Sequence, residues 1–177
     1  MEQEYTITAF SENSIGLLNR VTIIFTRRHI NIESLTVSQS SIPGVSKFTI
    51  VVNTTQEKVE KVTKQIDKLV EVLKAFFHTN DEIIQQEIAL YKVPTEALMN
   101  SKEIETMVRN SGARILEITP DYTVIEKTGH KSETQDLFHK LDKYGVTQFT
   151  RSGTVAVTKN PKELLTEYLK EMERIRG

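Results

Sequence analysis

Residues 11–37 read SENSIGLLNRVTIIFTRRHINIESLTV, and this stretch decides the fold. Its first part has apolar residues every three or four positions, as on the buried face of an amphipathic helix: Leu17, Leu18, Val21, Ile24 and Phe25. From residue 31 the period changes to two, which is typical of a half-buried strand. A short alternating segment, YTITAF at residues 5–10, precedes the helix. The chain is therefore predicted to begin strand, helix, strand.

The flanking residues complete a strand-helix-strand-strand-helix-strand unit. Pro43-Gly44 predicts a turn, after which residues 46–53 alternate as a strand paired with its predecessor. Residues 54–76 carry an amphipathic helix that gives way to a strand around residues 70–76. The same order then repeats, with strands at 82–93, 113–119, 121–127 and 146–158 and helices at 94–112 and 132–145, the latter opened by a capping box of Ser132 and Gln135.

Two successive βαββαβ units predict an α+β fold of two ferredoxin-like domains. Each domain should hold a four-stranded antiparallel sheet with two helices on one face. We expect the domains at residues 1–79 and 80–159, followed by a C-terminal amphipathic helix at 160–177. A sheet covered on one face only leaves its other face and its edges open, so the sequence also predicts an oligomer.

The C-terminal helix has two interpretations. Asn160 is the expected cap and Pro161 the first helical residue, ahead of an apolar stripe that starts at Leu164. The stripe packs on the helix's own second domain in one interpretation. In the other, it docks on a separate partner protein.

Composition excludes several classes of protein. The 177 residues are 38% hydrophobic, carry a net charge of −1 and include no cysteine. Without cysteine there is no disulfide scaffold, thiolate metal site or cysteine nucleophile. Apolar runs are far shorter than a membrane span needs, and the acidic N-terminus does not resemble a signal peptide, so we expect a cytoplasmic protein with no membrane partner.

No catalytic constellation is recognisable. The four histidines lack metal-ligand spacing, the glycines form no phosphate loop, and no nucleophile elbow is present. We therefore predict no catalytic residues, no metal and no cofactor in this chain. Nucleic-acid binding on this fold needs aromatic residues on the central strands. NIESLTV at 31–37 presents none and SKFTIVV at 46–52 presents only Phe48, without a basic rim, so no nucleic acid is expected.

Gly16 at the helix start is the one unusual position. Asn13 or Ser14 can cap this helix, and an alanine at position 16 would then serve it better. One explanation is that glycine lets an anion approach the amides at the positive end of the helix, with Asn13 orienting an amino-acid zwitterion. The other is that glycine relieves contact with a neighbouring helix or strand.

These residues are familiar as a family pattern. Residues 11–37 resemble the N-x-x-G-x-L-x-R-V and N-I-E-S-L-T-V signature of the acetolactate synthase (acetohydroxyacid synthase) small, regulatory subunits. ITPDYTVIEKTG and KLDKYGVTQFTRSGTVAV resemble motifs of that family's C-terminal domain. The resemblance covers about residues 5–158 and implies an N-terminal ACT domain, a ferredoxin-like amino-acid sensor.

The resemblance implies a subunit that is not an enzyme by itself. It would activate a catalytic subunit carrying thiamine diphosphate, FAD and Mg²⁺, which makes acetolactate from pyruvate, and it would mediate feedback inhibition by valine in branched-chain amino-acid biosynthesis. In the family two ACT domains form a homodimer with valine at the interface. Asn13, Gly16 and Leu17 match the positions that hold the amino-acid backbone, and Asn31 and Ile32 match those where the other protomer completes the pocket.

Three positions depart from the family pattern. Ile15 and Leu17 stand where smaller residues are common, and this added bulk predicts a smaller ligand or weaker valine binding. The family's usual glutamate shortly before the match to Arg151 is absent. An alternative function is a free-standing tandem amino-acid-sensing regulator of transcription or of another enzyme.

Overall fold

A computed structural model describes residues 1–99 and 102–176 of the chain. It divides into two compact units, and the chain passes from the first unit into the second and back. The first unit comprises residues 1–85 and 154–177, and the second comprises residues 86–153. This division differs from the expected boundaries at 79/80 and 159/160.

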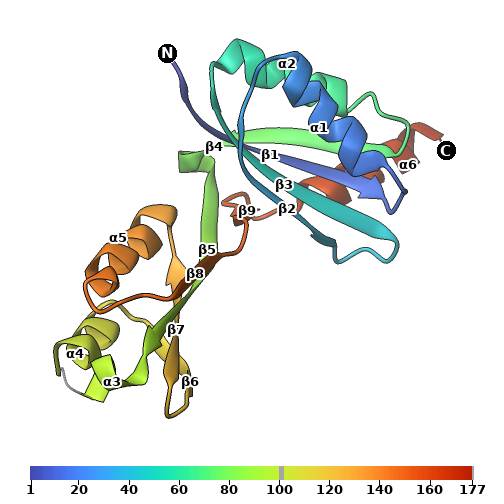
Figure 1. The fold of residues 1–177 in the computed structure, drawn as a ribbon. Coiled ribbons are helices and arrows are strands. Elements are labelled where there is room, and N and C mark those ends of the chain that lie inside the picture. Colours follow the sequence, from blue (N-terminus) through green and yellow to red (C-terminus); the bar gives the residue numbers. More distant parts are fainter. Residues whose placement is uncertain (100–101, 177) are drawn as a thin grey trace. The chain divides into compact units, whose positions relative to one another are not determined.

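The first unit is built on a four-stranded sheet in the order β2-β3-β1-β4 (Figure 1). All three strand pairs are antiparallel. The elements are β1 (Gln3–Glu12), α1 (Leu17–Arg27), β2 (Ile32–Gln39), β3 (Val45–Thr54), α2 (Gln56–Ile66) and β4 (Val72–Thr79), followed by the 3-10 turn η1 (Asn80–Glu82). The helix predicted after residue 54 is α2, and the strand into which it was expected to give way around residues 70–76 is β4.

The second unit repeats this topology in the order β6-β7-β5-β8. Its elements are β5 (Ile83–Pro94), which begins in the first unit, α3 (Thr95–Met99), α4 (Lys102–Asn110), β6 (Arg114–Ile118), β7 (Tyr122–Gly129), α5 (Lys131–Asp142) and β8 (Gln148–Arg151). The helix expected at 94–112 is described as α3 and α4, and residues 100–101 between them lie outside the described residues. The ferredoxin-like α+β fold of both units is thus as predicted.

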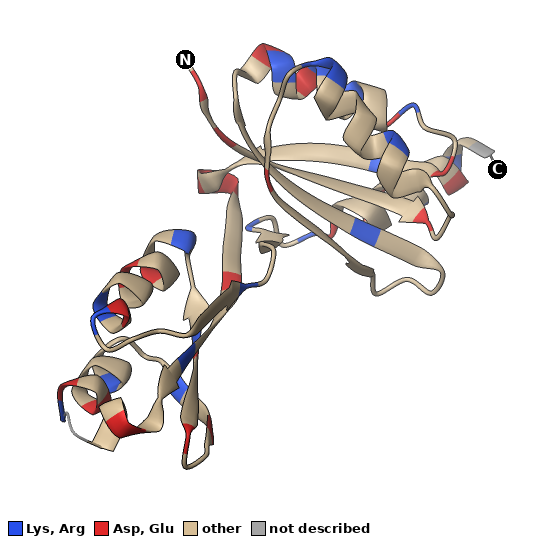
Figure 2. Cartoon of the chain, in the orientation of Figure 1, with Lys and Arg blue, Asp and Glu red and all other residues tan. Residues whose placement is uncertain are grey.

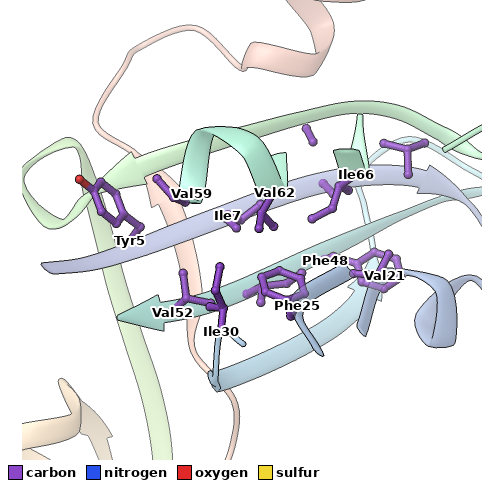
Figure 3. Packing of buried hydrophobic residues seen from close by; sticks show 14 of the residues in the cluster. Tyr5, Ile7, Val21, Phe25, Ile30, Phe48, Val52, Val59, Val62 and Ile66 are labelled. Carbon is purple, nitrogen blue, oxygen red and sulfur yellow. The ribbon is translucent and has the colours of Figure 1, made fainter. Parts of the chain in front are cut away.

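The main core of the first unit lies between the sheet and the two helices. Alternate residues of β1 and β3 point to that side and meet the buried faces of α1 and α2 (Figure 3). Ile7, Ile50, Val59, Val62 and Ile66 are fully buried there. On the outer side of α2 acidic and basic residues intermingle, as expected for a solvated face (Figure 2).

The C-terminal segment returns to the first unit. It holds β9 (Val155–Thr158), which pairs with β5, and α6 (Leu164–Arg176). Leu165 is fully buried against Phe10 and Val45, which lie on the sheet face opposite the main core. The interpretation that this helix packs on the second domain is therefore wrong, because its buried partners belong to the first sheet.

Three local expectations also need correction. The strand expected at 146–158 is two strands, β8 and β9, separated by residues 152–154. The box at α5 is formed by His130 and Glu133 rather than Ser132 and Gln135, and the His130 backbone N–H donates to the Glu133 carboxylate at 2.7 Å. At α6, Glu163 takes the capping role expected of Asn160, because its carboxylate accepts the Thr166 backbone N–H at 2.7 Å.

Candidate functional site

Gly16 lies immediately before α1 with φ +80° and ψ −2°. This is the left-handed region, which glycine enters without the steric cost that a Cβ imposes. A Cβ built at this position would meet no heavy atom within 4 Å. The expectation that alanine would serve better here is therefore wrong, and so is the explanation that glycine relieves a close contact. The backbone conformation requires glycine, and the space beside it is open.

The first turn of α1 has no side-chain cap. The Leu17 N–H donates to the Ser14 carbonyl at 3.3 Å, and the Arg20 N–H donates to the Gly16 carbonyl at 3.2 Å. In the described part of the chain, no side-chain oxygen caps this helix, and its first turn has no acidic residue. The expected cap from Asn13 or Ser14 is thus absent, and the positive end of the helix is left for an anion from elsewhere.

Leu17 is only 2% exposed and packs in the main core with Val21 and Phe25. Its side chain therefore adds no bulk outside α1, and only its backbone can contact a ligand. Ile15, by contrast, is fully exposed beside Gly16. Of the two bulky departures from the family pattern, only Ile15 can affect a ligand through its side chain.

Asn31 and Ile32 lie at the opposite end of the sheet. Ile32 begins β2 opposite Val52, which in turn lies opposite Tyr5 near the start of β1. Asn13, in contrast, follows the last residue of β1. The two groups are separated by about seven residues along the strands, or roughly 23 Å at ~3.3 Å per residue. One copy of the chain therefore does not bring the five predicted site residues together.

The edge beside Asn31 is open to a partner. β2 ends the sheet and pairs with β3 on one side only, among the strands described. Asn31 is exposed, and its amide N–H donates to the Glu33 carboxylate at 2.9 Å. Exposed apolar side chains occur farther toward the other end of the sheet, at Val37 of β2 and Leu18 of α1. An unpaired edge with apolar neighbours is a surface suited to strand pairing with a second chain.

The sequence reasoning missed an ion pair near the start of α1. Arg20 contacts Glu71 with 2.5 Å between Nη2 and Oε1, and the Glu71 carbonyl accepts the Glu12 backbone N–H. The hydrogen bond from Arg20 holds the pKa of the Glu71 carboxyl below its usual range. The pair ties α1 to the residue that precedes β4. In the sequence, the sign of this contact was Arg20 itself, the arginine three residues after Leu17 in the quoted motif.

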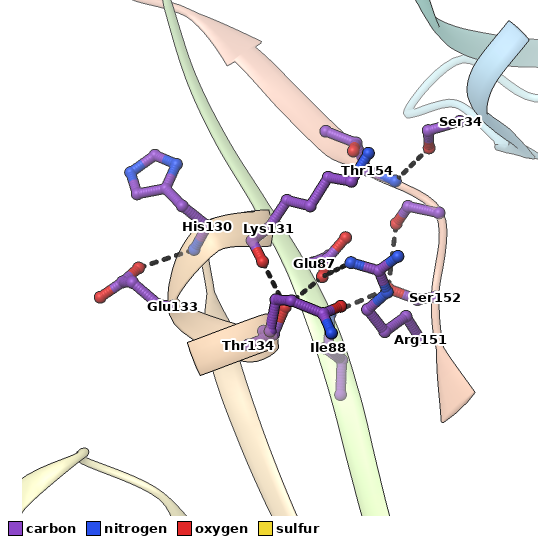
Figure 4. A network of polar contacts seen from close by, with 12 residues as sticks. Ser34, Glu87, Ile88, His130, Lys131, Glu133, Thr134, Arg151, Ser152 and Thr154 are labelled. Atoms are coloured by element: carbon purple, nitrogen blue, oxygen red, sulfur yellow. Dashed lines mark hydrogen bonds and ion pairs between the residues drawn. The ribbon is translucent and has the colours of Figure 1, made fainter. Parts of the chain in front are cut away.

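The second unit holds a buried polar cluster (Figure 4). Glu87 of β5 is 6% exposed and accepts a hydrogen bond from the Thr134 hydroxyl, while Arg151 Nη1 lies 3.5 Å from its carboxylate. Tyr91 donates to the Thr134 carbonyl at 2.6 Å, and burial raises the pKa of this phenol. These contacts join β5, α5 and β8, so the arginine of the family-like motif has a structural partner.

Among the residues that the structure describes, no group of three or more histidine and acidic side chains could hold a metal ion. None of the helices in residues 1–99 and 102–176 is long and apolar enough to cross a membrane.

Comparison with known proteins identifies both units. Residues 7–74 match the family model of the AHAS small subunit-like ACT domain, and residues 86–160 match that of the small subunit of acetolactate synthase. The acetolactate synthase small subunit of Bacillus subtilis is 37% identical over 89% of this chain and 91% of its own length. That of Mycobacterium leprae is 35% identical over 92% and 95%, respectively.

A solved structure supports the same family assignment. The crystal structure of the acetolactate synthase small subunit from Thermotoga maritima superposes with a TM-score of 0.81 at 29% identity, covering 90% of this chain and 99% of that one. The fold and the family match of residues 7–74 define an ACT-domain protein of the regulatory kind. The chain belongs to the acetolactate synthase small-subunit family.

Proposed function

We propose that this chain binds an acetolactate synthase catalytic subunit, raises its activity and transmits feedback inhibition by valine. Thiamine diphosphate, FAD and Mg²⁺ would be carried by the catalytic subunit, and this chain would hold none of them. Support comes from family membership and from the uncapped helix start at Gly16. The chain would act by binding valine with different affinities in two states of the assembly, for which about 1–3 kcal/mol of coupling suffices.

The observation that carries the proposal is the separation of the two groups of site residues. β1 and β2 run parallel, since both are antiparallel to β3. If two copies pair antiparallel through their β2 edges, the Ile32 end of one strand meets the Gln39 end of the other. The Gln39 end is also the end at which β1 leads to Gly16 and α1. A homodimer therefore brings Asn31 and Ile32 of one copy toward Asn13 and Gly16 of the other.

In this arrangement each residue has a distinct role. The ligand carboxylate approaches the first-turn amides of α1 beside Gly16, where helix dipole and unsatisfied N–H groups favour an anion. Asn13 is exposed next to this loop and orients the ammonium and carboxylate groups. Asn31 and Ile32 of the other copy close the site. Because both copies contribute, valine binding is linked to dimer assembly.

The first experiment is acetolactate formation by the catalytic subunit of the same genome, with and without this chain, across a valine titration. We expect activation that valine reverses. Gly16→Asp should remove the valine response and keep activation, because a carboxylate beside the first-turn amides repels the ligand's own. Gly145→Asp is the matched control, since Gly145 has φ +84° and equally open surroundings but belongs to the second unit.

A mixing experiment tests whether the site is shared between copies. Gly16→Asp and Asn31→Ala should each lose the valine response as pure proteins. After co-refolding, half of the dimers are mixed, and each mixed dimer has one intact site, so about a quarter of the sites should recover. Absence of any recovery would place the whole site in one copy. Valine binding without any effect on the synthase would instead support a free-standing regulator.

A further inference from the structure

The first sheet borders a cavity on the face opposite α1 and α2. Alternate residues of its strands point to this side, among them Thr8 of β1, Lys47 of β3 and His78 of β4. Residues 156–164 of the C-terminal segment cover them and leave a cavity of about 240 Å³. At ~30 Å³ for each water molecule, this is room for roughly eight waters or one small organic molecule. Nothing in the proposed function uses this cavity.

The sheet contributes two basic side chains to the cavity, Lys47 and His78, while Lys162 in the C-terminal part of the lining pairs with Glu167. Lys47 Nζ donates to the Ala156 carbonyl at 2.7 Å, and burial lowers the pKa of this ammonium although Glu163 partly offsets the effect. His78 Nε2 is buried without a hydrogen-bond partner among the described residues. Its Nδ1 lies 3.9 Å from the Glu82 carboxylate. A buried polar atom without a partner costs free energy, which a ligand in the cavity would recover.

The remaining walls are largely apolar. Phe10 and Phe76 come from the sheet, Ile83 from the start of β5 and Leu164 from the start of α6. The acidic residue in the lining, Glu163, already uses Oε2 to accept both the N–H and the hydroxyl of Thr166. The cavity therefore offers positive charge and hydrogen bonding together with apolar surface, and its carboxylate is committed to capping α6.

We propose that this cavity binds a small carboxylic acid anion with a short apolar chain. The carboxylate would contact Lys47 and His78, and the chain would lie against Phe10 and Phe76. A phosphate ester fits less well, because the half-buried Lys47 alone does not balance a dianion and the phenyl rings would gain nothing from it. The site is separate from the one at Gly16, since α1 lies on the other face of the sheet.

Binding of isovalerate to the full chain tests the proposal. We expect saturable NMR shifts of the His78 imidazole and of the Thr8 and Val157 amides. Acetate, which lacks the apolar chain, should bind more weakly, and isobutylamine, which replaces the carboxylate by an ammonium, should not bind.

Lys47→Met keeps most of the unbranched side chain but removes the ammonium group, and it should weaken isovalerate binding at least about tenfold, as expected for loss of a charged hydrogen bond. Lys159→Met is the matched control, because it removes the same charge from an exposed neighbour of the lining, and it should bind normally. Unchanged far-UV circular dichroism of both variants would exclude unfolding as the cause.

Three outcomes would overturn the proposal. The first is the absence of saturable shifts at isovalerate concentrations up to about 50 mM, well above a millimolar Kd. The second is equal affinity in Lys47→Met and the unmodified chain. The third is a set of shifts confined to residues 13–18 and 31–32, which would place isovalerate in the site of the proposed function and leave the cavity without a ligand.

Discussion

The two units have the same strand order but differ in what covers the second face of each sheet. In the first unit α6 buries Leu165 on that face against Phe10 and Val45. In the second unit the corresponding side of β5 exposes Ile88 and Leu90, at 46% and 38%. The second face of the sheet is thus covered by α6 in the first unit, whereas in the second unit, among the described residues, the same face of β5 is exposed to solvent. The contrast shows that the sheet itself does not require a second layer, and that residues outside the repeated unit decide whether one forms.

The largest expected effect is on the covered face. Leu165→Ala should lower the free energy of unfolding of the first unit by about 2–5 kcal/mol, because it empties a fully buried position. Amide hydrogen exchange, followed peptide by peptide, should show faster exchange in β1, β3 and β4 and little change in β5–β8. Equal acceleration in both units would contradict the assignment of α6 to the first.

In the second unit the substitution with the largest expected effect on stability is at a polar contact, the ion pair of Arg151 with Glu87. Arg151→Met should cost about 2–3 kcal/mol, since it leaves the buried Glu87 carboxylate without its cation. The value is set below that of a fully buried pair because 28% of the Arg151 side chain is exposed. Urea unfolding measures the loss, and the double variant Arg151→Met, Glu87→Gln should recover part of it. A single variant as stable as the parent would exclude a role for the pair.

Replacement of Gly16 by alanine should cost about 1 kcal/mol, the scale of forcing a residue with a Cβ into the left-handed region. Gly44→Ala should cost about the same, for the same reason. Thermal unfolding compares the two variants. If Gly16→Ala were neutral while Gly44→Ala was not, the backbone explanation of Gly16 would fail.

The free energy of unfolding of the first unit should also depend on pH, through His78 on the covered face of its sheet. Burial, and to a lesser degree Lys47, lowers the pKa of His78 from 6.5, while Glu82 opposes the shift. The unfolded chain then binds the proton more readily, so stability should fall as the pH decreases from about 7 to 5. His78→Gln should flatten this part of the profile in urea unfolding. The pKa values of Glu71 and Glu82 are also lowered, from 4.5. These two carboxyl groups therefore change the free energy of unfolding only at pH values below this window.

The smallest effect is expected on the uncovered face. Leu90→Ser should change the free energy of unfolding by no more than about 0.5 kcal/mol, since the side chain is already in solvent. Urea unfolding again measures it. A loss above 1 kcal/mol would mean that this face is covered in solution, and the contrast between the two units would disappear.

Hydrophobic periodicity predicted the twice-repeated topology because it reports which side of an element is buried. It could not identify the partner: the stripe beginning at Leu164 is compatible with any apolar surface, and Phe10 and Val45 are more than a hundred residues away in sequence. The break between β8 and β9 was missed because Phe149, Val155 and Val157 fit one period of two that spans residues 152–154.

The candidate site was predictable in part. Gly16 was recognised as unusual from its place in a helical pattern, but its φ is a property of the folded loop, so the backbone requirement for glycine was not predicted. Asn31 and Ile32 were found through a motif, while their position at the opposite end of the sheet follows from strand register, which the sequence does not specify uniquely. That the site needs two copies stays a prediction.

The return of residues 154–176 to the first unit has a consequence for synthesis of the chain. Translation delivers all of residues 86–153 before the residues that cover the first sheet. A nascent chain can thus complete its second unit while Phe10 and Val45 are still exposed. A frameshift or proteolytic cut near residue 153 would accordingly destabilise the first unit, whose sheet would lose α6, and leave the second unit intact.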